Sequence, residues 1–132
     1  IWVKNKCSSK EENKMKNQRT WIHCRVLAES SRNLLNYQEE VLSTLADDNN
    51  LKIAGVSKSI SSGKNFNSFD MQKLITHIKR HDIDIILVTS RKRIAIYDDL
   101  YEEFEMLCKM HDVLIISLKD IEDTISNIFS NC

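Results

Sequence analysis

Residues 83–89, IDIILVT, decide the fold prediction, because they form the most strongly apolar strand-like run in the chain. A short run of this kind, rich in β-branched side chains and preceded by polar residues, is typical of a strand buried on both faces. A second such run, VLIISL, occupies residues 113–118, and a helical pattern at residues 97–111 separates the two. Strand, helix and strand in this order predict a crossover connection between parallel strands.

The remaining elements continue the alternation in both directions. Strands are expected at residues 20–26 and 51–56, a Ser-, Gly- and Asn-rich loop at 57–68, and helices at 31–49, 69–80 and 121–129. In the first helix, one apolar stripe is expected; its members are Leu34, Leu35, Val41, Leu42 and Leu45. The pattern predicts an α/β fold with three layers, α/β/α, around a mostly parallel sheet of four to five strands.

The domain organisation expected from the composition is simple. A chain of 132 residues with 42% hydrophobic and 29% charged side chains suits one globular domain. We assign that domain to residues 20–132. Residues 1–19 are polar and lysine-rich, and we expect a loose helix or a disordered extension there.

No feature of the sequence points to a membrane or to export. No apolar run approaches the ~20 residues that span a bilayer, and the apolar stretch at the start is too short for a signal peptide. The four cysteines lie apart, with no CxxC pair, at Cys7, Cys24, Cys108 and Cys132. They are expected to be reduced thiols, two of them in the core, in a cytoplasmic protein.

The net charge of +0 hides a gradient along the chain. Residues 1–20 carry six basic and two acidic side chains, whereas residues 98–132 carry two basic and nine acidic ones. The basic half could favour a polyanion, although an unevenly charged solvated surface explains the same pattern. The acidic final quarter is a poor surface to lay against DNA.

The loops at the carboxyl ends of the strands are where a parallel sheet binds ligands. Arg25 ends the first predicted strand, and the loop after the third contains Arg91, Lys92 and Arg93. These side chains form either a basic rim around an anion or a set of solvated surface charges. No phosphate-binding loop of the GxxxxGK[ST] type is present, and His77 and His81 are interpreted as surface histidines. We therefore predict no cofactor and no metal site.

Three segments carry a resemblance to a known family. They are CRVLAESSRNLLNYQ (24–38), SKSISSGKNFNSFDMQKLI (57–75) and IILVTSRKRIAI (85–96). In this order they resemble the N-terminal catalytic domain of serine site-specific recombinases, the resolvases and invertases, over roughly residues 20–118. The resemblance implies a resolvase-like fold and a link to DNA recombination. The positions that it keeps are Arg25, Val26, Gln38, Ser62, Gly63 and Arg93.

The same resemblance implies a degenerate active site. Where the family has its nucleophilic Ser, directly after Arg-Val, this chain has Leu27. Ser68 stands where the family has an Arg, and Lys92 and Ile96 stand where it has an Asp and another Arg. Leucine has no nucleophilic atom, so a phosphoseryl link to DNA cannot form at residue 27. Ser30 and Ser31 are expected to cap the first helix and not to replace the nucleophile.

Three functions stay open at this stage. The first is a catalytically inactive recombinase-like domain that acts through protein association, with a second copy or with a recombinase-like partner. DNA contact would then come only from flanking regions. The second is an active recombinase that uses a non-standard serine. The third is a small anion-binding module, whose candidate residues are Arg25, Ser62, Gly63 and Arg93.

Overall fold

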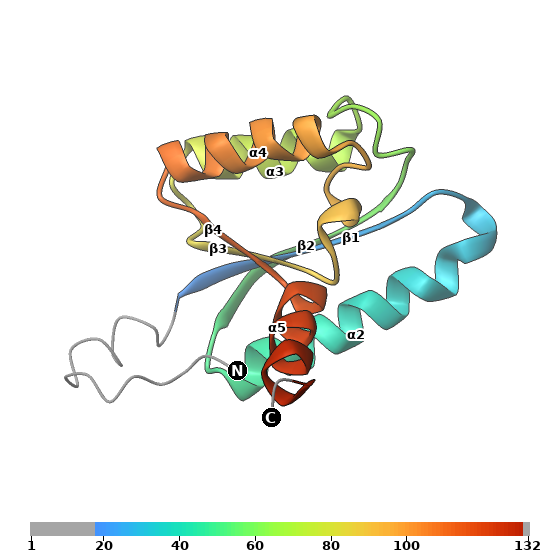
Figure 1. Ribbon diagram of the computed structural model, residues 1–132. Coiled ribbons are helices and arrows are strands. Elements are labelled where there is room, and N and C mark those ends of the chain that lie inside the picture. Colours follow the sequence, from blue (N-terminus) through green and yellow to red (C-terminus); the bar gives the residue numbers. More distant parts are fainter. Residues whose placement is uncertain (1–17, 131–132) are drawn as a thin grey trace.

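The sheet has four strands, all of them parallel (Figure 1). The computed structural model describes residues 18–130. Its strands are β1 (Arg19–Val26), β2 (Lys52–Ile60), β3 (Ile85–Val88) and β4 (Leu114–Ser117), in the spatial order β2-β1-β3-β4. This order places β1 and β3 at the centre, which explains why every residue of β3 is buried.

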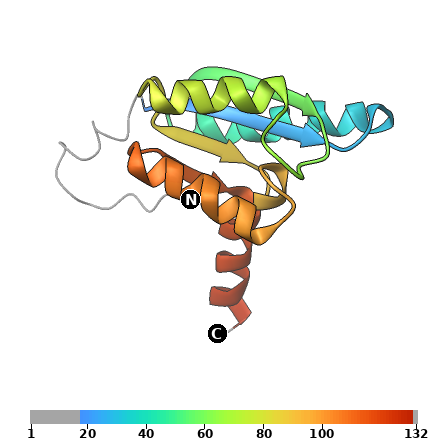
Figure 2. The same ribbon diagram turned by 90° about the horizontal axis from the view of Figure 1, so that it is seen from above.

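Helices cover both faces of the sheet, and this confirms the predicted three-layer α/β/α architecture. The helices are α2 (Arg32–Asp48), α3 (Phe69–Lys79), α4 (Asp98–Met110) and α5 (Leu118–Ser130), with short 3-10 helices η1 (Glu29–Ser31) and η2 (Arg91–Arg93). α3 and α4 lie on one face, and α2 and the start of α5 lie on the other (Figure 1). Figure 2 shows α5 projecting away from the rest of the domain.

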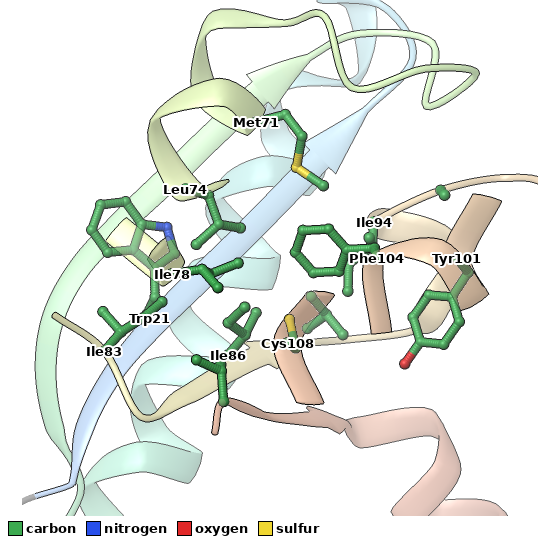
Figure 3. Close-up of a cluster of buried hydrophobic side chains, with 13 residues drawn as sticks. Trp21, Met71, Leu74, Ile78, Ile83, Ile86, Ile94, Tyr101, Phe104 and Cys108 are labelled. Carbon is green, nitrogen blue, oxygen red and sulfur yellow. The ribbon is translucent and has the colours of Figure 1, made fainter. Parts of the chain in front are cut away.

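The core beneath α3 and α4 combines aliphatic and aromatic side chains (Figure 3). Phe104 of α4 is almost fully buried, and Trp21 reaches this core from β1. A Cβ atom at Gly55 would lie 2.3 Å from the Trp21 ring, so β2 needs a glycine where it passes the indole. The indole ring of Trp21 therefore lies directly against the main chain of β2 at Gly55.

The core beneath α2 differs from the predicted stripe. Leu35 and Leu42 are buried as expected, but Leu34 is 39% exposed and Gln38 is only 1% exposed. The inward face of α2 therefore includes Gln38, a polar residue that the hydrophobic pattern did not predict to be buried. Cys24 and Cys108 are buried in the two cores, as predicted for two of the cysteines.

Two boundaries of the prediction were wrong. β2 continues through residue 60, so its second half lies where a loop was expected. α5 begins at Leu118, directly after β4, so Lys119 and Asp120 are helical and form no loop. In β2, polar side chains find partners inside the sheet: the Ser57 hydroxyl accepts a hydrogen bond from Trp21 Nε1. A Ser-rich segment is thereby accommodated in a strand.

The ends of the chain bear on two further predictions. The predicted extension, residues 1–19, lies outside the described residues except for Gln18 and Arg19. Among residues 18–130, no helix combines the length and the apolarity needed to cross a bilayer.

Candidate functional site

The candidate site lies at the carboxyl ends of β1 and β3. In the order β2-β1-β3-β4 the chain moves outward from β1 in one direction and from β3 in the other, so this point is the topological switch of the sheet. Arg25 at the end of β1, the loop 61–68 after β2 and η2 after β3 meet there. The ends of β1, β2 and β3 are thus brought together, whereas the chain after β4 continues directly into α5.

Arg25 is buried and holds these segments together. Its Nε donates to the backbone carbonyl of Arg93 at 3.1 Å. Its two terminal nitrogens donate to the carbonyls of Ser61 at 2.8 Å and of Lys92 at 2.6 Å. The side chain is bonded to main-chain oxygens on two loops, and the residue as a whole is only 6% exposed. Burial, and next to it the charge of Arg93, lower the pKa of Arg25.

The main chain of Arg25 is held from the other side. The Gln38 side chain of α2 accepts from the Arg25 backbone nitrogen at 3.2 Å and donates to its carbonyl at 3.1 Å. Arg93 also donates to that carbonyl, at 3.1 Å. The three retained residues Arg25, Gln38 and Arg93 therefore form one hydrogen-bonded cluster that joins β1, α2 and η2.

Gly63 packs directly on the guanidinium of Arg25. It has a positive φ of 72°, and a Cβ atom there would lie 2.7 Å from Arg25 Cζ. Its carbonyl accepts from the Ile96 backbone nitrogen at 3.0 Å. Ser62 turns to its own loop, where its hydroxyl accepts from the Lys64 backbone nitrogen at 3.2 Å. Of the four anion-binding candidates, the structure brings Arg25, Gly63 and Arg93 together, whereas the Ser62 side chain bonds within its own loop.

A second set of buried polar side chains, Trp21, His23 and Ser57, lies in β1 and β2 near the same site. Ser57 Oγ accepts from Trp21 Nε1 at 3.0 Å and lies 2.7 Å from His23 Nδ1. Burial, and then the charge of Arg25, lower the pKa of His23 to about 4, against a hydrogen bond to the Arg93 backbone that raises it. The sequence offered no signal for this pair, since serine and histidine come from different strands.

Two of the substituted positions, Ser68 and Lys92, bond within the fold, whereas Leu27 is exposed. Leu27, at the position of the nucleophile in the family resemblance, is 70% exposed just beyond β1. The Ser68 side chain caps α3 by accepting from the Met71 backbone nitrogen. Lys92 Nζ donates to the carbonyl of Ile96 at 2.8 Å. By contrast, no side-chain cap starts η1 or α2, so the expected capping by Ser30 or Ser31 was wrong.

Little space remains between these groups. A pocket with room for about one water molecule opens here. Its lining residues are His23, Arg25, Ser61, Gly63, Asn65, Ser68, Met71 and Ile94. Within residues 18–130, no group of three side chains is arranged to hold a metal ion. The geometry is that of a closed, hydrogen-bonded junction, with the exposed side chain of Leu27 two residues beyond Arg25.

The comparisons with known proteins define the family. Residues 8–130 match the family described as "Resolvase, N terminal domain". The chain therefore belongs to this family, the resolvase-type domain of serine recombinases, which is related to DNA recombination. No curated protein matches the sequence.

Solved structures agree with this assignment. The chain is similar to the C-terminal catalytic domain of ISC1926 TnpA, an IS607-like serine recombinase: TM-score 0.72, 27% identity, with 85% of this chain and 81% of that one covered. The N-terminal catalytic domain of TP901-1 integrase has a TM-score of 0.69 at 20% identity, with 78% of each chain covered. A resolvase family site-specific recombinase from Streptococcus pneumoniae has a TM-score of 0.69 at 16% identity, with 87% of this chain and 89% of that one covered. The last two likenesses concern the fold.

Proposed function

We propose that this domain is a catalytically inactive member of its family and acts in a DNA recombination system through protein association. The observation that supports this proposal is that the site at the switch point lacks a nucleophile and has its central arginine bonded to the main chain. Leu27 occupies the position that the family resemblance gives to the nucleophile, and Arg25 spends its donors on three backbone carbonyls. Phosphoryl transfer depends on positive groups aimed at the reacting phosphate.

The helix α5 supports the association part of the proposal. Ile121, Ile125 and Ile128 are spaced by four and three residues and so share one face of the helix. Ile121 packs against the core, whereas Ile125 is 40% and Ile128 is 58% exposed. Exposed apolar side chains on a projecting helix (Figure 2) are typical of a surface that a partner covers. The partner is a second copy of this chain or a recombinase-like protein, in the cytoplasm.

The first experiment tests inactivity directly. The full chain is incubated with supercoiled DNA, and covalent protein–DNA adducts are sought on a denaturing gel. We expect none. An adduct that is lost in one of the variants Ser30→Ala, Ser31→Ala, Ser62→Ala or Ser90→Ala would instead establish an active recombinase with a non-standard serine.

The second experiment tests association. Light scattering coupled to size-exclusion chromatography gives the mass of the wild type, alone and mixed with an active serine recombinase. We expect a complex that the double change Ile125→Ser and Ile128→Ser dissociates and that Glu122→Gln, an exposed change on the same helix, leaves intact. A wild-type chain that remains monomeric in both conditions would contradict the proposal.

A further inference from the structure

Two histidines meet at the end of the sheet opposite to Arg25. His81 directly follows the C-cap residue of α3, and His111 is the C-cap residue of α4. The centroids of their rings lie 5.1 Å apart, and the ring planes are inclined by 55°. α3 and α4 run side by side on the same face of the sheet (Figures 1 and 2), so residues thirty positions apart become neighbours.

The backbone holds both rings in place. His81 has a left-handed φ of 60°, and its backbone nitrogen donates to the Ile78 carbonyl at 3.1 Å. The His111 nitrogen donates to the Cys108 carbonyl at 3.1 Å, and the next residue, Asp112, has a φ of 58°. Both helices therefore end in tight turns that leave the main chain little freedom.

One imidazole nitrogen of this pair lacks a partner. His111 Nδ1 is buried and has no hydrogen-bond partner among residues 18–130. Buried polar side-chain atoms nearly always have one, so an exception needs an explanation. A neutral imidazole nitrogen without a proton is a ligand for a transition-metal ion.

The separation of the rings fits shared coordination. With a metal–nitrogen distance of about 2.1 Å, and roughly 1.2 Å from nitrogen to ring centre, two imidazoles on a tetrahedral ion have centroids about 5.4 Å apart. The observed 5.1 Å is slightly shorter, and it also lies in the range of ordinary ring–ring contacts, about 4.5 to 7 Å. His81 is exposed whereas His111 Nδ1 is buried, so an ion reaches the pair from the His81 side.

The helix dipoles favour a cation here, against the basic side chains of Lys79, Arg80 and Lys109 at the same two helix ends. The C-terminal ends of two helices meet here, and each carries a partial negative charge. His77, one turn before His81, is engaged elsewhere: its Nδ1 lies 3.1 Å from Asp82 Oδ2, and its ring stacks on Trp21 with centroids 4.8 Å apart. Among residues 18–130 the candidate ligands are therefore these two histidines, and water completes the coordination.

We propose that His81 and His111 form a two-histidine site for a divalent transition-metal ion that prefers imidazole, such as Zn²⁺. The ion joins the ends of α3 and α4. Because the two rings meet only in the folded chain, the ion binds the native state and raises its stability. This site is separate from the Arg25 junction and is independent of the proposed association.

The test measures zinc binding and thermal unfolding of the full chain. Cys7 and Cys132 are first changed to Ser, because free thiols bind the same ions. Zn²⁺ is expected to raise Tm, and EDTA to reverse the rise. His81→Asn is expected to weaken the Kd for Zn²⁺ by about tenfold or more, since even an outer-shell change costs that much. His111→Asn should have the same effect.

His77→Asn and Mg²⁺ serve as controls: the first should keep the zinc effect, and the second should produce none. A Cu²⁺ spectrum with hyperfine coupling to two nitrogens would identify the imidazole ligands directly. The absence of a zinc-dependent rise in Tm in the parent chain would overturn the proposal. So would an unchanged Kd in His81→Asn, an exposed position at which the substitution leaves the core intact.

Discussion

Arg25 and Arg93 bond each other reciprocally: the side chain of each donates to the backbone carbonyl of the other, both at 3.1 Å. Two like charges approach because each is aimed at a main-chain oxygen and not at the other guanidinium. The pair joins β1 to the segment after β3 across the switch point of the sheet. Residues that the family resemblance assigns to phosphate chemistry thus also organise the fold in this chain.

The first prediction concerns Arg25. Arg25→Lys is expected to lower the free energy of unfolding by about 2 to 3 kcal/mol, because an ammonium cannot span three carbonyls and leaves buried acceptors without donors. Urea unfolding measures the change. The same change at Arg91, which is exposed and pairs with Asp120 at 2.7 Å, should cost under about 1 kcal/mol. Equal effects at both positions would show that the Arg25 cluster contributes nothing special.

Gly63 supplies a second test of the same junction. Gly63→Ala is expected to destabilise by about 1 to 2 kcal/mol from the left-handed backbone alone, and by more because its methyl group displaces the Arg25 guanidinium. In a double-mutant cycle with Arg25→Ala, the second contribution should disappear, so the two changes should cost less together than the sum of their separate costs. Strict additivity, measured by urea unfolding, would mean that the two residues do not press on each other.

The sequence was sufficient for the three layers and for the alternation of strands and helices, because apolar runs such as residues 83–89 report burial directly. It failed where polar residues are buried. Gln38 was left out of the helical stripe because an amide breaks an apolar pattern, yet its side chain bonds both backbone groups of Arg25. β2 was cut short for a similar reason, since Ser57 and Ser59 suggested a loop but are buried in the strand.

The candidate site shows the same division. The motif positions predicted which loops would meet, since carboxyl ends of parallel strands share one edge. They could not show that Arg25 is bonded to carbonyls. Every residue has a backbone carbonyl, so the sequence does not reveal which carbonyls accept these bonds. Nor could the motif positions pair His23 with Ser57, or His81 with His111, since each pair forms only when separate elements pack together.

His23 predicts a pH dependence of stability. Its pKa is lowered to about 4 in the folded chain, whereas an unfolded histidine titrates near 6.5. Between these values the unfolded state binds more protons, so stability should be complete above about pH 6.5 and fall as the pH drops toward 4. The full loss is on the order of 3 kcal/mol.

Urea unfolding at about pH 7 and about pH 5 measures this effect. His23→Gln should flatten the dependence in that window, and His77→Gln should preserve it. Asp84, whose pKa is lowered chiefly by its bond to Arg19, loses its contribution only at more acid pH and so does not confuse the reading. A wild-type chain equally stable at both values would show that His23 is not kept neutral by burial.

The last prediction addresses catalysis. Leu27→Ser places a hydroxyl at the family's nucleophile position, and since residue 27 is 70% exposed the change should leave stability unaltered. We still expect no covalent DNA adduct, because the nucleophile alone does not supply the positive groups missing at Ser68 and Ile96. The loss of one stabilising group at a reaction centre already costs about 10²-fold or more in rate.

The informative comparison is the variant that adds Ser68→Arg, Lys92→Asp and Ile96→Arg to Leu27→Ser, assayed with the single change on the same supercoiled DNA. An adduct only in the combined variant would show that the surrounding charges, as well as the hydroxyl, limit the chemistry. An adduct formed by Leu27→Ser alone would show that Arg25 and Arg93, despite their bonds to the main chain, still stabilise a reacting phosphate, and that one residue separates this domain from an active recombinase.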